Sequence, residues 1–75
     1  MITLEQIQNR LIKAIKQSGL NQSEIARCLG ISHSQISRYV HGQKMPALDT
    51  LANLCTILNV EPNYILCSDL KDTDI

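Results

Sequence analysis

The sequence has neither tryptophan nor phenylalanine and only two tyrosines among its 75 residues, so aliphatic side chains must fill its core. Its three glycines and two prolines stand at separated points, as expected of helices joined by short connections. It has no apolar run of the roughly 18 residues that a membrane span needs. Its first residues lack the basic start and apolar stretch of a secretion signal. These absences predict one soluble, cytoplasmic, all-α domain.

The three cysteines, Cys28, Cys55 and Cys67, are odd in number and include no C-x-x-C pair. Neither histidine lies at a ligand-like spacing from a cysteine, so we expect no metal and no cofactor. The simplest interpretation is that they are reduced thiols, with Cys55 in an apolar stripe and Cys28 more exposed. A redox switch at Cys28 is the alternative. No Ser/His/Asp or Cys/His set and no Gly-rich nucleotide loop is present, which argues against an enzyme.

Charge is balanced in total, with seven basic and seven acidic residues, but it is unevenly placed along the chain. Only Glu5 and Glu24 are acidic in the first 44 residues, where six residues are basic: Arg10, Lys13, Lys16, Arg27, Arg38 and Lys44. Beyond that point, five acidic residues face Lys71 alone. A basic front suits a surface that faces phosphates. A charged face that is merely solvated fits the same distribution, so charge alone does not decide the function.

Apolar periodicity predicts the helices at both ends of the chain. Residues 4–17 read as an amphipathic helix whose apolar positions are Leu4, Ile7, Leu11 and Ile15. After a polar loop that ends at Pro46, a fourth helix runs from about residue 48 to residue 59, and Pro62 begins a short fifth helix. We therefore expect a domain over residues 1–67, followed by an acidic flexible tail over residues 68–75.

Two short capped helices are predicted between these ends. Asn21 is a favourable N-cap, and Glu24, three residues later, completes a capping box. Gly30 ends this helix after two turns. Ser32 then caps the next helix, with Gln35 as its reciprocal partner. Only a few residues connect the two helices, so the helices must lie next to each other, which predicts a helix-turn-helix.

From Asn21 to Ser32 the sequence reads N-Q-S-E-I-A-R-C-L-G-I-S. This stretch resembles the lambda-repressor/Cro-like (XRE-type) helix-turn-helix family, and the likeness extends over residues 4–66. Ala26 is small where the next helix crosses, and Gly30 supplies the left-handed turn. The resemblance implies a compact five-helix, lambda-repressor-like fold with its helix-turn-helix at about residues 21–41. It also implies double-stranded DNA as a partner.

The helix over residues 32–40 is predicted to read base edges in the major groove. At about 100° per residue, Ile36, Tyr39 and Val40 turn inward and leave one outward ridge. The base-reading candidates on and beside this ridge are His33, Ser34, Ser37 and Arg38. An arginine there can donate two hydrogen bonds to guanine O6 and N7. The alternatives are a surface salt bridge for the arginine and plain solvation for the histidine.

The resemblance also implies phosphate contacts at the rim of this surface. The family uses the first residue of its second helix, which is Gln22 here, and Asn21 beside it can help. The loop after the reading helix adds His41, Gln43 and Lys44. Many family members carry Asn in place of His41, although either ring nitrogen of a histidine could donate. The basic residues of the first helix are outer candidates only: Arg10, Lys13 and Lys16.

These features predict a sequence-specific, DNA-binding transcriptional regulator, a repressor of the phage or prophage Cro-like type. One helix-turn-helix buries too little surface for tight binding, so we expect a homodimer on a pseudo-palindromic operator. Apolar residues of the last two helices exceed what one small core needs and mark the dimer surface: Leu58, Val60, Tyr64, Ile65 and Leu66. The alternative is a protein-interaction module, such as an antitoxin or co-regulator that binds a partner protein through its acidic tail.

Overall fold

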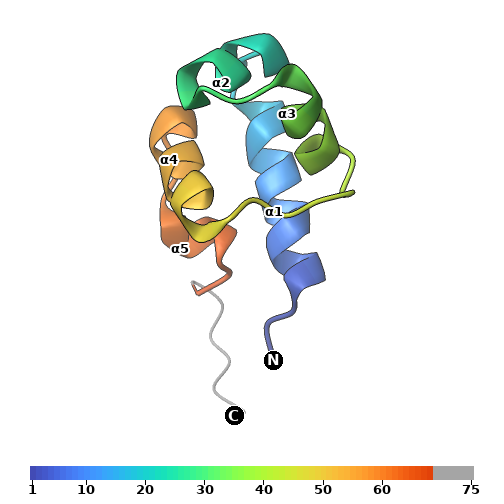
Figure 1. The fold of residues 1–75 in the computed structure, drawn as a ribbon. Helices are drawn as coiled ribbons and strands as arrows, with labels where there is room; N and C mark the ends of the chain where they lie inside the picture. The colour runs from blue at the N-terminus through green and yellow to red at the C-terminus, as the bar shows by residue number, and fades with distance from the viewer. Residues whose placement is uncertain (69–75) are drawn as a thin grey trace.

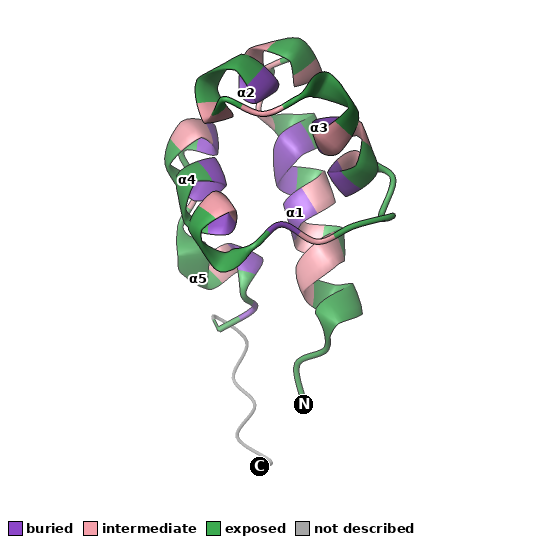
Figure 2. Ribbon diagram, in the orientation of Figure 1, coloured by how far each residue is buried: buried purple, intermediate pink, exposed green. Residues whose placement is uncertain are grey.

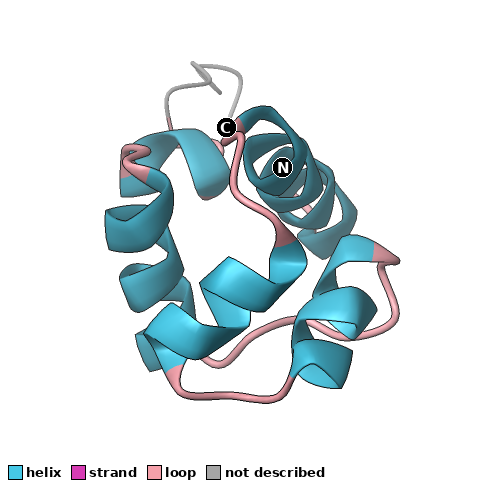
Figure 3. Ribbon diagram, turned by 90° about the horizontal axis from the view of Figure 1, so that it is seen from above, coloured by secondary structure: helices cyan, strands magenta, loops and turns pink. Residues whose placement is uncertain are grey.

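The computed structural model describes residues 1–68, and within this range it contains five α-helices and no strand. The helices are α1 (Leu4–Gln17), α2 (Gln22–Leu29), α3 (His33–Val40), α4 (Leu48–Leu58) and α5 (Pro62–Ile65). In Figure 1, α2 lies across the top of the bundle, α3 lies on one side of α1, and α4 and α5 lie on the other side. Helix α5 contacts both α1 and α4, and Figure 3 shows the same all-helical bundle from above. The predicted all-α, five-helix, lambda-repressor-like architecture is confirmed. Apart from Ser68, the predicted tail lies outside the described residues.

One aliphatic core joins all five helices, and the buried positions face inward in Figure 2. Each helix contributes at least one side chain that is almost completely buried: Leu11, Ile25, Ile36, Leu54 and Ile65. Among the described residues no charged or polar side chain is buried. The absence of large aromatic residues is therefore met by branched aliphatic ones, with Tyr39 as the single buried ring.

Cys28 and Cys55 lie where the sequence predicts them, and no position was predicted for Cys67. Cys28 is exposed on α2, whereas Cys55 and Cys67 are buried. Removal of Cys55 from water raises the pKa of its thiol, because burial disfavours the charged thiolate, and a hydrogen bond with the backbone opposes this rise only in part. Cys55 is therefore a neutral, apolar part of the core.

The helix starts follow the predicted capping residues, with one exception. Asn21 Oδ1 accepts from the Glu24 backbone N–H at 2.8 Å, and the Glu24 side chain bonds back to the Asn21 backbone, which completes the expected box. Ser32 Oγ accepts from the Gln35 backbone N–H at 3.3 Å. The reciprocal half predicted for Gln35 is wrong, because the Gln35 side chain instead accepts a hydrogen bond from Lys44. The start of α4 at Ala47 has no side-chain cap.

Four helices end in the same closing motif, in which a left-handed residue lets two backbone N–H groups turn back to the last carbonyls. Gly30 closes α2 and Gly42 closes α3, at φ angles of 69° and 71°. Asn59 closes α4 and Cys67 closes α5, at 55° and 62°. Glycine and asparagine commonly adopt this conformation, whereas a left-handed cysteine is not readable in the sequence.

Candidate nucleic-acid interface

The turn between α2 and α3 fixes how these two helices cross. At its start, the Gly30 N–H donates to the Arg27 carbonyl at 3.2 Å, and the Ile31 N–H donates to the Ala26 carbonyl at 3.1 Å. Ala26 is 4% exposed and Ile36 is fully buried, so the two helices pack directly on each other. A larger residue than alanine would hold them apart. The outer face of α3 therefore has one defined direction.

That outer face is polar and lacks acidic residues. His33, Ser34 and Arg38 are exposed, and Ser37 is half-buried beside them. Ser34 Oγ lies 3.1 Å from Ser32 Oγ. In the part of the chain that the structure describes, the Arg38 guanidinium has no hydrogen-bond or ion-pair partner. The surface salt bridge considered for this arginine is therefore not formed within that part.

His41, directly after α3, uses one of its two ring nitrogens inside the protein. Its Nδ1 lies 2.7 Å from the Ser37 carbonyl oxygen and 3.2 Å from Ser37 Oγ. A carbonyl oxygen only accepts, so Nδ1 carries the hydrogen and donates it. The expectation that either ring nitrogen could donate outward is wrong. Only Nε2 of this exposed side chain is left, and in the neutral tautomer Nε2 is an acceptor.

The start of α2 presents the predicted pair of polar residues. Gln22 is half-buried and is the first residue of the helix, where backbone N–H groups lack partners within the helix. Asn21 is exposed, but its side-chain oxygen is committed to capping the helix. Its amide nitrogen is the part of the Asn21 side chain that this cap leaves available.

The loop after α3 is held by residues that sequence reasoning missed. Gln43 and Lys44 are exposed, and Lys44 Nζ donates to Gln35 Oε1 at 3.4 Å. Gln8 of α1 donates from Nε2 to the Gly42 carbonyl oxygen at 3.1 Å. Gln8 and Gly42 are 34 residues apart, so no local pattern could reveal their contact.

The basic face of α1 divides into one internal residue and two exposed ones. Arg10 Nη1 donates to the Tyr64 carbonyl oxygen at 2.8 Å, and its guanidinium lies 4.6 Å from the centre of the Tyr64 ring. Arg10 therefore fastens α5 to α1, and its place among the outer phosphate candidates is a wrong prediction. Lys13 and Lys16 are exposed on the same helix.

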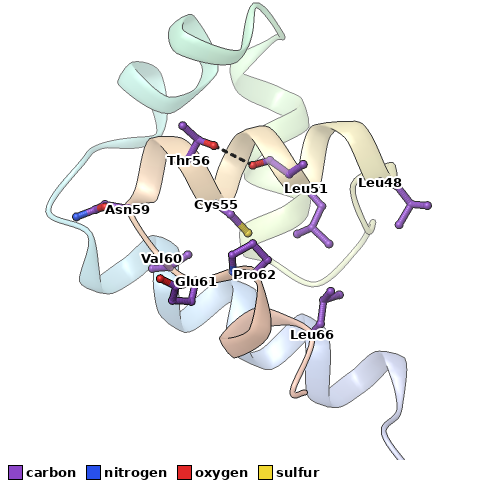
Figure 4. Close-up of a pocket in the computed structure, with 10 residues that line it drawn as sticks. Leu48, Leu51, Cys55, Thr56, Asn59, Val60, Glu61, Pro62 and Leu66 are labelled. Atoms are coloured by element: carbon purple, nitrogen blue, oxygen red, sulfur yellow. Dashed lines mark hydrogen bonds between the residues drawn. The ribbon is translucent and has the colours of Figure 1, made fainter. Parts of the chain in front are cut away.

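An open groove of about 600 Å³ lies between α4 and α5, on elements other than α3 (Figure 4). Leu48, 84% exposed, and Leu66, 39% exposed, belong to its lining. Of the residues predicted to mark a dimer surface, Leu58 and Ile65 are buried in the protein's own core, and Val60 and Tyr64 pack against it. Only Leu66 of that set is counted among the exposed large apolar residues.

Two other features are absent from the described residues. No helix there has the length and apolar character needed to cross a membrane. No group of three or more His, Cys, Asp or Glu side chains there is arranged to hold a metal ion.

Two short helices that cross at a tight glycine turn, the second with an exposed polar face, define a helix-turn-helix domain. A protein-family model described as helix-turn-helix matches residues 11–65, and this chain belongs to that family. The resemblance noted in the sequence is thus confirmed.

Two relatives are informative. The HTH-type transcriptional regulator ImmR of Bacillus subtilis (strain 168) is 35% identical over 60 residues, which are 80% of this chain and 47% of the regulator. The ImmF control region 10 kDa protein of Bacillus phage phi105 is 27% identical over 56 residues, which are 75% of this chain and 62% of that protein. The matches thus span about half of the first relative and less than two thirds of the second. No solved structure matches the chain significantly.

Proposed function

We propose that this protein is a sequence-specific, double-stranded-DNA-binding transcriptional repressor of the phage Cro-like type. The observation that carries the proposal is the outer face of α3, where His33, Ser34 and Arg38 are exposed and no acidic residue is present. Such a face can enter a groove lined by base edges and phosphates without charge repulsion. Membership of the helix-turn-helix family and a phage-derived relative support the assignment.

In this proposal, the base-reading residues are the four at the outer face of α3, and the phosphate contacts surround them. Within the described residues no partner occupies the Arg38 guanidinium, so its side-chain donors are available for guanine O6 and N7. The phosphate-contacting residues lie at the start of α2 and in the loop after α3: Asn21, Gln22, His41, Gln43 and Lys44. All five are polar, and all except half-buried Gln22 are exposed.

The repressor acts as a homodimer on a pseudo-palindromic operator, with half-sites about 34 Å apart. A single helix-turn-helix buries too little surface for tight and selective binding. Leu48 and Leu66 beside the α4–α5 groove supply exposed apolar area for a second copy. Because the groove lies on α4 and α5, a second copy that docks there leaves the outer face of α3 open.

The test is a pair of substitutions combined with a salt titration. Selection from a random duplex library identifies the preferred site. Arg38→Ala should then lose about 1–3 kcal/mol on that site and relax the preference at one base pair. Gln22→Ala should weaken binding to all sequences about equally, and because glutamine is uncharged it should leave the slope of the salt dependence unchanged.

Log affinity of the wild-type chain should fall with log salt, with a slope near −0.9 for each phosphate neutralised. A flat response would reject DNA binding and favour the interaction module that binds a protein partner. Base preference that survives Arg38→Ala would show that the assignment of the reading residue is wrong.

A further inference from the structure

The loop that joins α3 to α4 crosses α1, and its first turn contains three of the proposed phosphate-contacting residues (Figure 1). They flank Gly42, whose φ of 71° lies in the left-handed region. Glycine restricts its own backbone less than any other residue, so the orientation of the peptide after Gly42 must be set by contacts from outside.

Two hydrogen bonds hold this peptide from opposite sides. Its carbonyl oxygen, on Gly42, accepts from Gln8 Nε2 at 3.1 Å. Its N–H, on Gln43, donates to the Arg38 carbonyl oxygen at 2.9 Å. The second bond belongs to the helix end, whereas the first comes from a different helix and is the tertiary restraint on this peptide.

The Gln8 side chain also packs against the glycine. A methyl group built on Gly42 would lie 3.5 Å from both Gln8 Cδ and Oε1, so the amide group is in contact range of the Gly42 backbone. Gln8 is half-buried, while Gly42 and the hydrogen bond to its carbonyl are exposed. Gln8 therefore holds the Gly42–Gln43 peptide both by packing against it and by a directional hydrogen bond.

We propose that Gln8 of α1 is a positioning residue for DNA binding: its amide fixes the Gly42–Gln43 peptide and thereby aims Gln43 and Lys44 at the phosphate backbone. This inference rests on the proposed function and deepens it, because it assigns a role to a residue outside the helix-turn-helix. Gln8 touches no DNA in this scheme. It acts through the loop, so its loss changes affinity without changing the base that is preferred.

The experiment replaces Gln8 by methionine, which has a similar length and helix propensity but no amide. Gln17→Met is the matched control, since Gln17 is exposed on the last turn of α1 and forms no side-chain hydrogen bond within the described residues. The probe is a pool of mixed-sequence duplexes, bound at low salt and at a temperature at which urea unfolding shows both variants to be folded. Amide NMR shifts of Gln43 and Lys44 in the DNA-free protein report the loop directly.

Gln8→Met should shift both loop amides and weaken duplex binding about three- to tenfold, the effect of losing one hydrogen bond, while Gln17→Met does neither. In a background in which Gln43 and Lys44 are both alanine, Gln8→Met should cost little more, because the residues that it positions are gone. Unchanged affinity in Gln8→Met, or a loss confined to one base identity, would overturn the positioning role. A wild-type chain with no salt-dependent affinity would reject the DNA-binding function itself, and the role of Gln8 with it.

Discussion

The residues proposed to contact DNA differ in how much of their bonding capacity the protein already uses. Arg38 has no side-chain partner among residues 1–68, whereas the Asn21 oxygen is used by the helix cap and His41 Nδ1 by the Ser37 carbonyl. A side chain whose donors are unused can bind a base or a phosphate without first breaking a hydrogen bond within the protein. The others act only through the atoms that remain.

This difference gives a prediction at His41. The Ser37 carbonyl occupies Nδ1, so only Nε2 can meet a phosphate. His41→Ala should therefore weaken binding to all duplex sequences about equally, by roughly the 0.5–1.5 kcal/mol of one hydrogen bond. Fluorescence anisotropy at constant ionic strength measures the effect.

The control is His41→Asn, because an asparagine amide can still donate to a phosphate. This variant should bind more tightly than His41→Ala. Unchanged affinity in His41→Ala would show that the ring does not contact phosphate.

Gly30 gives a second prediction at the scale of one residue. Its φ is 69°, and a Cβ built on it meets no atom within 4 Å, so only the backbone conformation opposes a side chain there. Gly30→Ala should lower the free energy of unfolding by about 1–2 kcal/mol, the cost of a left-handed L-residue. Gly30→Asn should cost less, since asparagine visits this region more readily. Urea denaturation of both variants checks the order, and equal costs would contradict the conformational explanation.

Among the elements, α5 depends most on a distant partner. It has only four residues, too few to be stable alone, and Arg10 of α1 holds it through the Tyr64 carbonyl and ring. Arg10→Met should lower the free energy of unfolding by about 1–2 kcal/mol, because a charged hydrogen bond near the surface is partly screened. It should also speed hydrogen exchange in α5 selectively. Lys13→Met, at an exposed site on the same helix, should leave this exchange unchanged.

The elements also show what could be predicted from the sequence. Local signals lie within a few residues of each other, as in the Asn21–Glu24 box or at Gly30, and they correctly placed the five helices. Left-handed Cys67 was not predicted, because cysteine has no preference for this conformation, and Asn59 was missed although asparagine visits this region readily. Contacts of side chains with residues far apart in the sequence could not be predicted either.

Contacts of this kind explain the errors at the candidate interface. Arg10 looked like a free cation because its partner, Tyr64, is 54 residues away. Gln35 looked like half of a capping box because its partner, Lys44, lies in the next loop. In contrast, the exposure of Ser34 and Arg38 follows from helical period alone, so this part of the surface was readable.

At the scale of the whole molecule, the proposed homodimer depends on apolar side chains that the core does not use. Leu48 is 84% exposed, so Leu48→Glu should leave the fold intact while placing a charge beside the α4–α5 groove. Loss of one buried leucine per copy should cost association about 1.5–3 kcal/mol for each side chain. Sedimentation should then show a monomer, and affinity for the palindromic site should fall toward that for a half-site.

Leu4→Glu is the matched control, because Leu4 is 71% exposed on α1, away from the groove. This variant should sediment as the wild type does. A wild-type chain that is monomeric at working concentration, or equal effects of the two substitutions, would argue against a dimer through this groove.

The exposed face of α3 also has an evolutionary consequence. Ser34 and Arg38 add nothing to the hydrophobic interior, which is built from other positions of the same helix, such as Ile36 and Tyr39. Substitutions at Ser34 and Arg38 can therefore accumulate without loss of the core contacts of Ile36 and Tyr39. Under the proposed function, a few substitutions at Ser34 and Arg38 would change the preferred DNA site, so closely similar copies in one cell could diverge until each binds a different site.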